Sequence, residues 1–140
     1  MHGPQGCNAH ALRKAARHVS ALYDQALAPY GLRGTQFSIL ARLAATGPWS
    51  MQALADKLVV DRTTLARAVQ PLERDGLVAL SADPADRRIR LLTLTAQGAA
   101  RHQAALSGWQ AAQARYESAI GAERAAQLRA ELRHVARTRF

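Results

Sequence analysis

Side chains that can bind another molecule gather in this sequence between Asp61 and Thr95. The first half of the stretch, DRTTLARAVQPLERDGLV, places apolar and polar residues at helical spacing, which predicts an amphipathic helix. The second half predicts two short strands, Leu77–Leu80 and Ile89–Leu94, joined by an Asp-Pro turn that carries two arginines. A polar helix fits the major groove of DNA and a basic hairpin fits the minor groove, so this stretch predicts a DNA-binding unit.

The helix in this stretch has separate polar and apolar faces. Asp61 precedes it, and a carboxylate at that position accepts hydrogen bonds from the first free N–H groups. Pro71 lies inside it and predicts a bend near Arg67 or a redirected last turn, because proline removes a backbone donor. Gly76 is the predicted left-handed stop. The apolar face consists of Leu65, Ala68, Val69 and Leu72, and the opposite face shows Arg62, Thr63, Thr64, Arg67 and Gln70.

Further helices flank this unit on both sides. A first helix is predicted to begin near Asn8 and to end at Pro29. Thr35 and Ser50 are predicted to cap two more helices, and Thr95 to cap a long fifth helix. The fifth and last helices carry residues at heptad-like spacing: Ala99, His102, Leu106, Trp109, Gln113, Tyr116 and Ile120, then Ala125, Leu128, Leu132 and Val135.

The long helices cannot bury such seams against so small a unit, so the sequence predicts a two-fold homodimer. A two-fold axis suits a palindromic DNA operator. The expected fold is mostly α, a winged helix-turn-helix with a short β-hairpin wing and long flanking dimerisation helices. The chain is expected to form one domain, 1–140, with dimerisation helices at 8–34 and 95–140 and a DNA-binding region at 35–94.

The stretch also resembles the MarR family of winged helix-turn-helix regulators. The resemblance lies in DRTTLARAVQPLERDGLV, followed by D-P-x-D-R-R and L-T-L-T, and it covers nearly the whole chain. It implies that the wing arginine, here Arg88, enters the minor groove and that Asp86 orients it. Ala85 departs from the family pattern, because many relatives carry another basic residue there.

The candidate DNA contacts have different expected roles. Thr63, Thr64 and Arg67 are candidates for base edges, because arginine can bind guanine through two hydrogen bonds and threonine offers a methyl or a hydroxyl group. Backbone or solvent contacts are expected for the other basic and amide side chains, and phosphate contacts for the start of the third helix. The full set is Ser50, Gln52, Arg62, Thr63, Thr64, Arg67, Gln70, Asp86, Arg87 and Arg88.

Composition agrees with a polyanionic partner without proving one. Among 140 residues, 49% are hydrophobic, and the formal net charge is +9 with a pI near 11.2. From Arg62 to Arg90, however, six arginines stand against four acidic residues, so the excess charge lies mostly elsewhere. No apolar run reaches the roughly 18 to 20 residues that cross a bilayer. A single cysteine and an N-terminus unlike a signal peptide predict a cytoplasmic protein with no membrane partner.

The family resemblance also implies a small aromatic or phenolic effector, bound between the dimerisation helices and the DNA-binding unit. The candidate residues for such a pocket are Arg17, Tyr23, Phe37, Trp49 and Trp109, with Arg17 as the partner of a carboxylate. No cofactor is expected.

Cys7 offers a redox alternative. Some relatives sense hydroperoxides through a cysteine that tyrosines hydrogen-bond, but alignment on Tyr23 places Ala9 at that position and Gly34 in place of the second tyrosine. Cys7 and His10 have helical i, i+3 spacing with His2 nearby, yet no fourth ligand is close, so no metal is expected.

No catalytic motif is present, so the sequence does not predict an enzyme. The expected function is that of a sequence-specific DNA-binding transcriptional regulator, a homodimeric repressor released by a ligand. Two alternatives stay open: a redox-responsive regulator acting through Cys7, and a winged-helix module that binds protein and not DNA.

Overall fold

The computed structural model describes residues 3–140. His2, which was considered with Cys7 and His10 as a possible metal ligand, therefore lies outside the described residues. The helices are η1 (Pro4–Gly6), α1 (Asn8–Leu27), η2 (Ala28–Tyr30), α2 (Gly34–Thr46), α3 (Met51–Leu58), α4 (Arg62–Arg74), α5 (Ala96–Ile120) and α6 (Ala122–Arg137). The strands are β1 (Trp49–Ser50), β2 (Val78–Ala82) and β3 (Arg90–Leu94), which form an antiparallel sheet in the order β1-β3-β2. The mostly α winged fold predicted from the sequence is confirmed.

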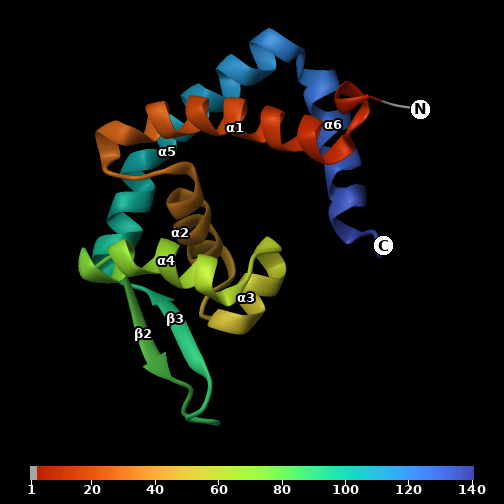
Figure 1. Cartoon of the computed structure of the whole chain (residues 1–140). Coiled ribbons are helices and arrows are strands. Elements are labelled where there is room, and N and C mark those ends of the chain that lie inside the picture. The colour runs from red at the N-terminus through yellow and green to blue at the C-terminus, as the bar shows by residue number, and fades with distance from the viewer. Residues whose placement is uncertain (1–2) are drawn as a thin grey trace.

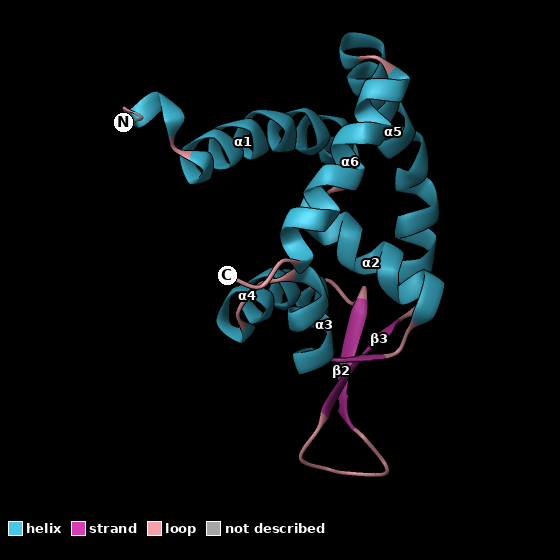
Figure 2. Cartoon of the chain, turned by 90° about the vertical axis from the view of Figure 1, so that its right-hand side faces the viewer, coloured by secondary structure: helices cyan, strands magenta, loops and turns pink. Residues whose placement is uncertain are grey.

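The elements form two parts, which Figure 1 shows one above the other. We call the part made of α2, β1, α3, α4, β2 and β3 the reader, and β2, β3 and their connecting loop the wing. Helix α1 lies above the reader, α5 runs down along one side of it and α6 descends on the other side, while the wing projects from the bottom (Figure 2). We call the outer half of α1 together with α6 the terminal arm (residues 8–18 and 122–137). The wing and the terminal arm are therefore at opposite ends of the molecule.

The core joins α5 to the reader, and the predicted apolar face of α4 forms part of it. Leu65, Val69 and Leu72 are buried, and Ala68 is half-buried. Leu27 from the end of α1 and Leu92 from β3 are fully buried in the same core. Because these side chains anchor α4 from one side only, its opposite face is free to contact another molecule.

Three predicted caps are confirmed. The Ser50 hydroxyl accepts a hydrogen bond from the Ala53 N–H at 3.1 Å, and the Asp61 carboxylate accepts one from the Thr64 N–H at 2.6 Å. The Thr95 hydroxyl accepts one from the N–H of Gly98 at 3.0 Å. Each side-chain oxygen satisfies a donor that a helix start leaves without an intrahelical partner.

The predicted cap of α2 at Thr35 is wrong, because the helix begins at Gly34, two residues earlier than that cap implies. Arg33 is the capping residue, and its N–H donates to the side-chain oxygen of Gln36 at 3.0 Å. The Gly34 N–H donates to Asp24 of α1 at 2.8 Å. A tertiary contact with α1 thus replaces the local cap that a threonine would give.

Helix α4 continues through Pro71 to Arg74, so its last turn is not redirected. The Asp75 N–H still donates to the Pro71 carbonyl at 3.0 Å, and Gly76 then adopts the predicted left-handed conformation with φ of 75°. Proline sits only one turn from the end of the helix, where the lost donor disrupts little of it.

The strands differ slightly from the predicted bounds, and one was missed. β2 and β3 begin one residue later than predicted, and β2 extends to Ala82. β1 is only two residues long and pairs Trp49 with Leu92 of β3. Such a short strand has no alternating pattern that the sequence could reveal.

The predicted seam of α5 is only half-buried from His102 to Tyr116 and is exposed at its two ends. The residues that are fully buried belong to the neighbouring stripe: Gly98, Ala105, Gly108 and Ala112. A Cβ placed on Gly108 would lie 2.6 Å from the Ala26 carbonyl oxygen, which only a glycine tolerates. The small residues therefore let α5 approach α1 and the reader closely, while the heptad residues, which were predicted to need a partner helix, stay partly exposed in the single chain.

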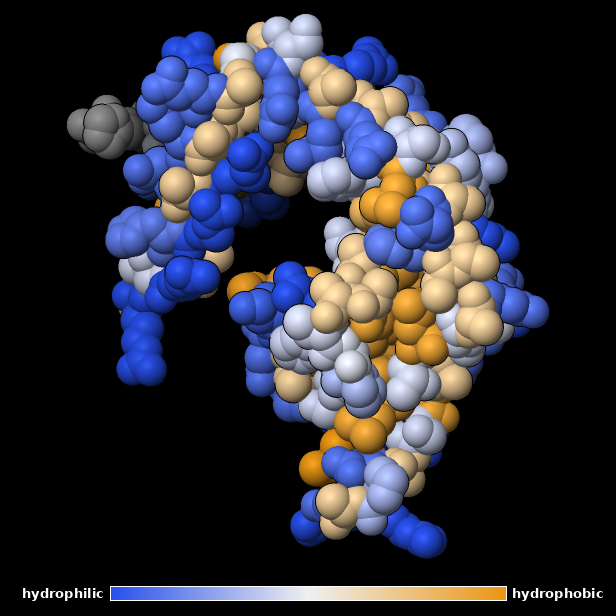
Figure 3. All heavy atoms as spheres, turned by 180° about the vertical axis from the view of Figure 1, so that it is seen from behind, coloured by the Kyte–Doolittle hydropathy of each residue, from blue (hydrophilic) through white to orange (hydrophobic). Residues whose placement is uncertain are grey.

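The terminal arm leaves large apolar side chains in contact with solvent. Leu12 of α1 is 43% exposed, and Leu128 and Leu132 of α6 are 42% and 41% exposed. Figure 3 shows the arm standing apart from the reader, with an open hollow between them. Within residues 3–140, the structure contains no helix with the length and apolar character needed to cross a membrane.

Candidate nucleic-acid interface and the adjoining cavity

Three of the predicted DNA contacts on α4 share one exposed face. Thr63, Arg67 and Gln70 follow one another at four- and three-residue steps and line the same shallow depression beside β2. Thr64 is exposed as well, but it lines a cavity on the other side of the helix. Glu73 continues the first face and was missed, because its charge does not suit a DNA contact. The structure therefore groups Thr63 with Arg67 and separates Thr64 from them.

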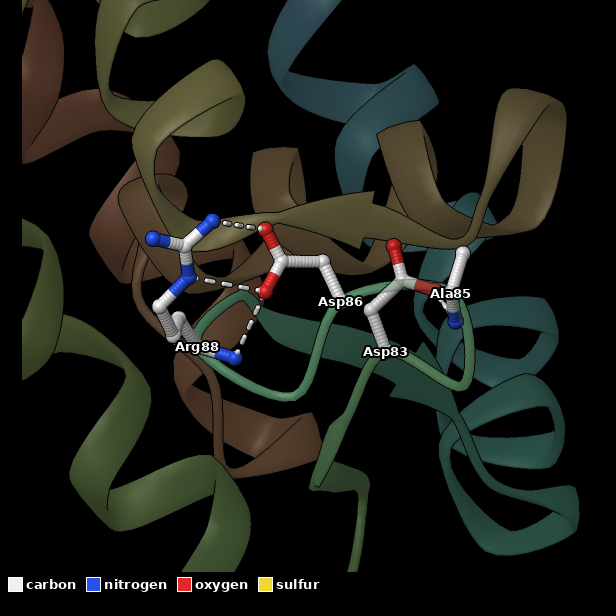
Figure 4. A network of polar contacts seen from close by, with 4 residues as sticks. All are labelled: Asp83, Ala85, Asp86 and Arg88. Carbon is white, nitrogen blue, oxygen red and sulfur yellow. Dashed lines mark hydrogen bonds and ion pairs between the residues drawn. The ribbon is translucent and has the colours of Figure 1, made fainter.

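At the tip of the wing, Asp86 holds Arg88 in a two-pronged contact (Figure 4). The Arg88 Nε donates to Asp86 Oδ1 at 3.0 Å and Nη2 donates to Oδ2 at 3.0 Å. The Arg88 N–H also donates to Oδ1 at 3.1 Å. These bonds hold the pKa of Asp86 below its ordinary value and raise the pKa of Arg88. The pairing implied by the resemblance is present, and it orients the arginine.

The loop around this pair is fixed by further backbone hydrogen bonds. Asp83 accepts a bond from the Ala85 N–H at 2.9 Å through its side chain. The Asp83 N–H donates to the Ile89 carbonyl at 2.8 Å, and the Ile89 N–H donates to the Asp86 carbonyl at 2.9 Å. Arg87 is exposed in the same loop. The loop thus presents two adjacent arginines on a rigid turn.

The predicted phosphate contacts at the start of α3 are partly committed to other bonds. The Ser50 hydroxyl caps α3, and the Gln52 amide nitrogen donates to Asp56 at 2.9 Å. Both residues nevertheless line one small hollow with Arg62 of α4 and Arg88 of the wing. Sequence reasoning assigned these four residues to three separate elements, and the structure brings them together at one hollow.

A cavity of about 550 Å³ lies between α1, α2, α4 and α5, and Leu58 at the end of α3 completes its lining. Tyr23, Phe37 and Trp109 line it as predicted, and the Phe37 and Trp109 rings stack with centroids 6.1 Å apart. The Tyr23 hydroxyl donates a hydrogen bond to the Gln113 side chain, and burial, followed by the nearby Glu117 charge, raises the Tyr23 pKa. The walls are thus mainly aromatic and aliphatic.

Two of the predicted pocket residues do not line this cavity. Arg17 lies six residues before Tyr23 on α1, and six residues are about 1.7 helical turns, so the two side chains point in different directions. Trp49 belongs to β1, where its indole N–H donates to Thr46 at 3.0 Å. Arg33 lines the cavity instead. Asp24 also lines it, and its carboxylate accepts a hydrogen bond from the Gly34 N–H. The cationic residue of the cavity therefore comes from the start of α2 and was missed.

Cys7 is exposed at the start of α1. It precedes Tyr23 by 16 residues, which corresponds to about 24 Å along a helix, so the two side chains of one chain do not meet. Within residues 3–140 no group of three or more potential metal-ligating side chains occurs. A redox role for Cys7 stays a prediction.

Comparison with known proteins decides the family. The model of the MarR family matches residues 32–89, which is most of the reader. A solved structure of MosR from M. tuberculosis in complex with DNA is 36% identical, covers 94% of this chain and 99% of that chain, and has a TM-score of 0.77. The chain belongs to the MarR family.

Other relatives of this MarR-family chain are also named as transcriptional regulators. The repressor NicR of Pseudomonas putida is 37% identical over 89 residues, which is 64% of this chain and 56% of NicR. The chain thus matches little more than half the length of that relative. CouR from Rhodococcus jostii RHA1, solved with p-coumaroyl-CoA, is 26% identical, covers 100% of this chain and 99% of CouR, and has a TM-score of 0.80.

Proposed function

We propose that this MarR-family chain is a homodimeric, sequence-specific DNA-binding transcriptional regulator, a repressor that a small aromatic or phenolic ligand releases from DNA. The observation that carries the proposal is the rigid wing tip, where Asp86 presents Arg88, beside the exposed face of α4. Helix α4 enters the major groove, where Thr63 and Arg67 contact base edges. Arg88 enters the minor groove, whose narrow A·T-rich regions attract arginine.

The terminal arm supplies the proposed dimer contact. Its exposed leucines cover an apolar surface that a second copy of the chain would bury, and its separation from the reader leaves room for that copy. A two-fold dimer places two α4 helices against one duplex, and they must be about 34 Å apart to meet successive major grooves. The spacing of the two readers therefore decides whether the dimer binds DNA.

The cavity is the proposed effector site. It touches α1 and α5, which belong to the proposed dimer part, and α2 and α4, which belong to the reader. A ligand that fits the cavity better in one arrangement of these helices shifts the population toward that arrangement. Its aromatic walls favour a flat ring, and Arg33 offers a charge for a carboxylate or phenolate. The CouR structure with p-coumaroyl-CoA and the DNA complex of MosR support this proposal by similarity.

Binding to duplex DNA is the decisive experiment. Purified protein is used to select operators from a random duplex library, and the selected duplex is titrated at several salt concentrations. Each neutralised phosphate adds about −0.9 to the slope of log affinity against log salt, so several contacts per subunit predict a slope steeper than about −4. A slope near zero for every duplex would overturn the DNA-binding proposal and favour a protein-interaction module.

The redox alternative is separated by Cys7→Ser. If the ligand-released proposal holds, this variant binds the operator and responds to effectors like the wild type. Peroxide that releases the wild type but not Cys7→Ser from DNA would instead assign the switch to Cys7. The proposal also places the protein in the cytoplasm, because a regulator that binds chromosomal DNA must reach it there.

A further inference from the structure

Three arginines meet between the recognition helix α4 and the wing. Arg62 begins α4, Arg88 ends the turn of the wing, and Arg90 begins β3. Their side chains line a hollow of about 180 Å³, whose wall is completed by Ser50 and Gln52 at the start of α3. Arg90 is absent from the set of DNA contacts that the sequence predicts.

Two of these arginines form no ion pair with an acidic residue of the described part of the chain. Within the described range 3–140, the ion pairs involve Arg74, Arg88 and Arg129, so neither Arg62 nor Arg90 has a carboxylate within 4.0 Å. Both side chains belong to exposed residues. A guanidinium fork matches the oxygen atoms of a carboxylate or phosphate, so two free forks at one hollow favour an oxyanion.

The position of the hollow selects the anion. When α4 lies in the major groove and the wing in the adjacent minor groove, one sugar–phosphate strand runs between them. A hollow bounded by α4 on one side and by the wing on the other faces that strand. Its volume of about 180 Å³ is about six times the share of one water molecule in the liquid, which suffices for a phosphate group with bound water.

We propose that Arg62 and Arg90 clamp one backbone phosphate on the strand that separates the two grooves. The inference rests on the proposed function, since it requires DNA binding. Phosphate contacts position a protein on the duplex without reading sequence. This clamp fixes α4 relative to the wing on the DNA, so that base contacts and minor-groove contacts are made in one register.

The test uses the full-length protein and a fluorescent 30-bp duplex of scrambled sequence, because a phosphate contact needs no operator. Affinity is measured at several salt concentrations for the wild type, for Arg62→Ala, for Arg90→Ala and for the double variant. If both arginines hold the same phosphate, a dimer of the double variant loses two phosphate contacts, and its slope becomes less steep by about 1.8. The two single variants are then strongly non-additive in affinity.

Arg74→Ala is the matched control, because Arg74 is equally exposed to solvent at the other end of α4 and pairs with Asp75 at 3.3 Å. It removes the same charge and is expected to keep the wild-type slope. Arg90→Lys keeps the charge and is expected to restore most of the affinity that Arg90→Ala loses. Circular dichroism melts confirm that these surface variants fold.

The outcomes separate the inference from the proposed function. A change of about 3.6 in the double variant would show two different phosphates, and a wild-type affinity in Arg90→Ala would show that Arg90 contacts none; either result overturns the clamp. A loss in Arg90→Ala that is confined to selected operators would indicate base reading and would also overturn it. A wild-type protein that binds no duplex at low salt would overturn the proposed function and the clamp together.

Discussion

The Asp86 carboxylate grips the Arg88 guanidinium at two points, each 3.0 Å long, although 90% of the Arg88 side chain is exposed. So exposed an ion pair adds little to stability. Its consequence is orientation, because a free arginine side chain samples many rotamers and this one is held in one fork. Arg88 holds the pKa of Asp86 below its ordinary value, so the fork is complete at neutral pH and is lost only as the pH falls through that lowered pKa.

Removal of Arg88 should weaken binding to many DNA sequences at once. The minor groove offers a degenerate pattern, so Arg88→Ala should reduce affinity broadly, and most at sites with A·T-rich flanks. Asp86→Ala should have a milder effect of the same kind, because it frees the guanidinium without removing it. Competition titrations against an operator library measure both. Unchanged affinity in a folded Arg88→Ala protein would mean that the wing does not enter the groove.

Removal of Arg67 should have a narrower effect. Arg67 shares the exposed face of α4 with Thr63, and Arg67→Ala should lower affinity for the best operator by about 1 to 3 kcal/mol and relax preference at one position per half-site. The same library titration reads out the position. An equal loss for every sequence would instead assign Arg67 to the phosphate backbone.

A charge on the apolar face of α6 should prevent dimerisation. Leu128 is 42% exposed in the single chain, and burying an unpaired carboxylate against a second copy is unfavourable. Sedimentation should show Leu128→Glu as a monomer with reduced DNA affinity. Gln127→Glu adds a carboxylate to the neighbouring exposed residue and should stay dimeric. If Leu128→Glu also sediments as a dimer, this face of α6 is not part of the interface.

Arg33 should contribute to effector binding and Arg17 should not. Trp109 lines the cavity and Trp49 does not, so Trp49→Phe leaves Trp109 as the single tryptophan of the chain. Benzoate should change its emission, and Arg33→Ala should weaken the apparent affinity about tenfold, the loss of one charged hydrogen bond. Arg17→Ala removes the same charge and serves as the control; its apparent affinity for benzoate should equal that of the Trp49→Phe protein. Equal effects of both variants would point to a general charge effect outside the cavity.

The sequence predicted those parts of the fold that depend on local signals. Capping side chains such as Ser50, Asp61 and Thr95 act on donors two or three residues away, so their spacing identifies helix starts without tertiary information. The wing motif likewise carries its own ion pair between Asp86 and Arg88. The MarR resemblance is confirmed by the family match and by a solved relative.

The parts that the sequence did not predict depend on contacts between distant segments. The cavity proposed for the effector is lined by residues of five helices, and helical phase turns Arg17 away from it while Arg33 enters from the start of α2. Arg62 and Arg90 belong to α4 and β3 and line one hollow only in the folded chain. The close packing of α5 relies on glycine and alanine, which contribute little to a hydrophobic periodicity, so this buried stripe was not predicted from the sequence.

The glycine at the start of α5 provides a last prediction. A Cβ on Gly98 would lie 1.9 Å from the Leu77 carbonyl oxygen and 2.7 Å from Leu94, so Gly98→Ala must push α5 away from the sheet. Helix propensity alone predicts that this change stabilises the protein by about 1 kcal/mol. Overpacking predicts the opposite, a loss of about 1 to 3 kcal/mol in the free energy of unfolding. The sign of the measured change therefore shows whether propensity or overpacking dominates.

Urea unfolding of Gly98→Ala measures that sign, with Ala104→Gly on the exposed side of α5 as the reference for propensity. Ala104→Gly should lose about 1 kcal/mol through the ordinary cost of glycine in a helix. If Gly98→Ala is destabilised as well, sterics outweigh propensity and α5 is locked against Leu77. DNA affinity should then fall with stability, because α5 positions the reader. A stabilised Gly98→Ala protein would show that α5 can shift away from the sheet without loss, which contradicts the close packing described for this helix.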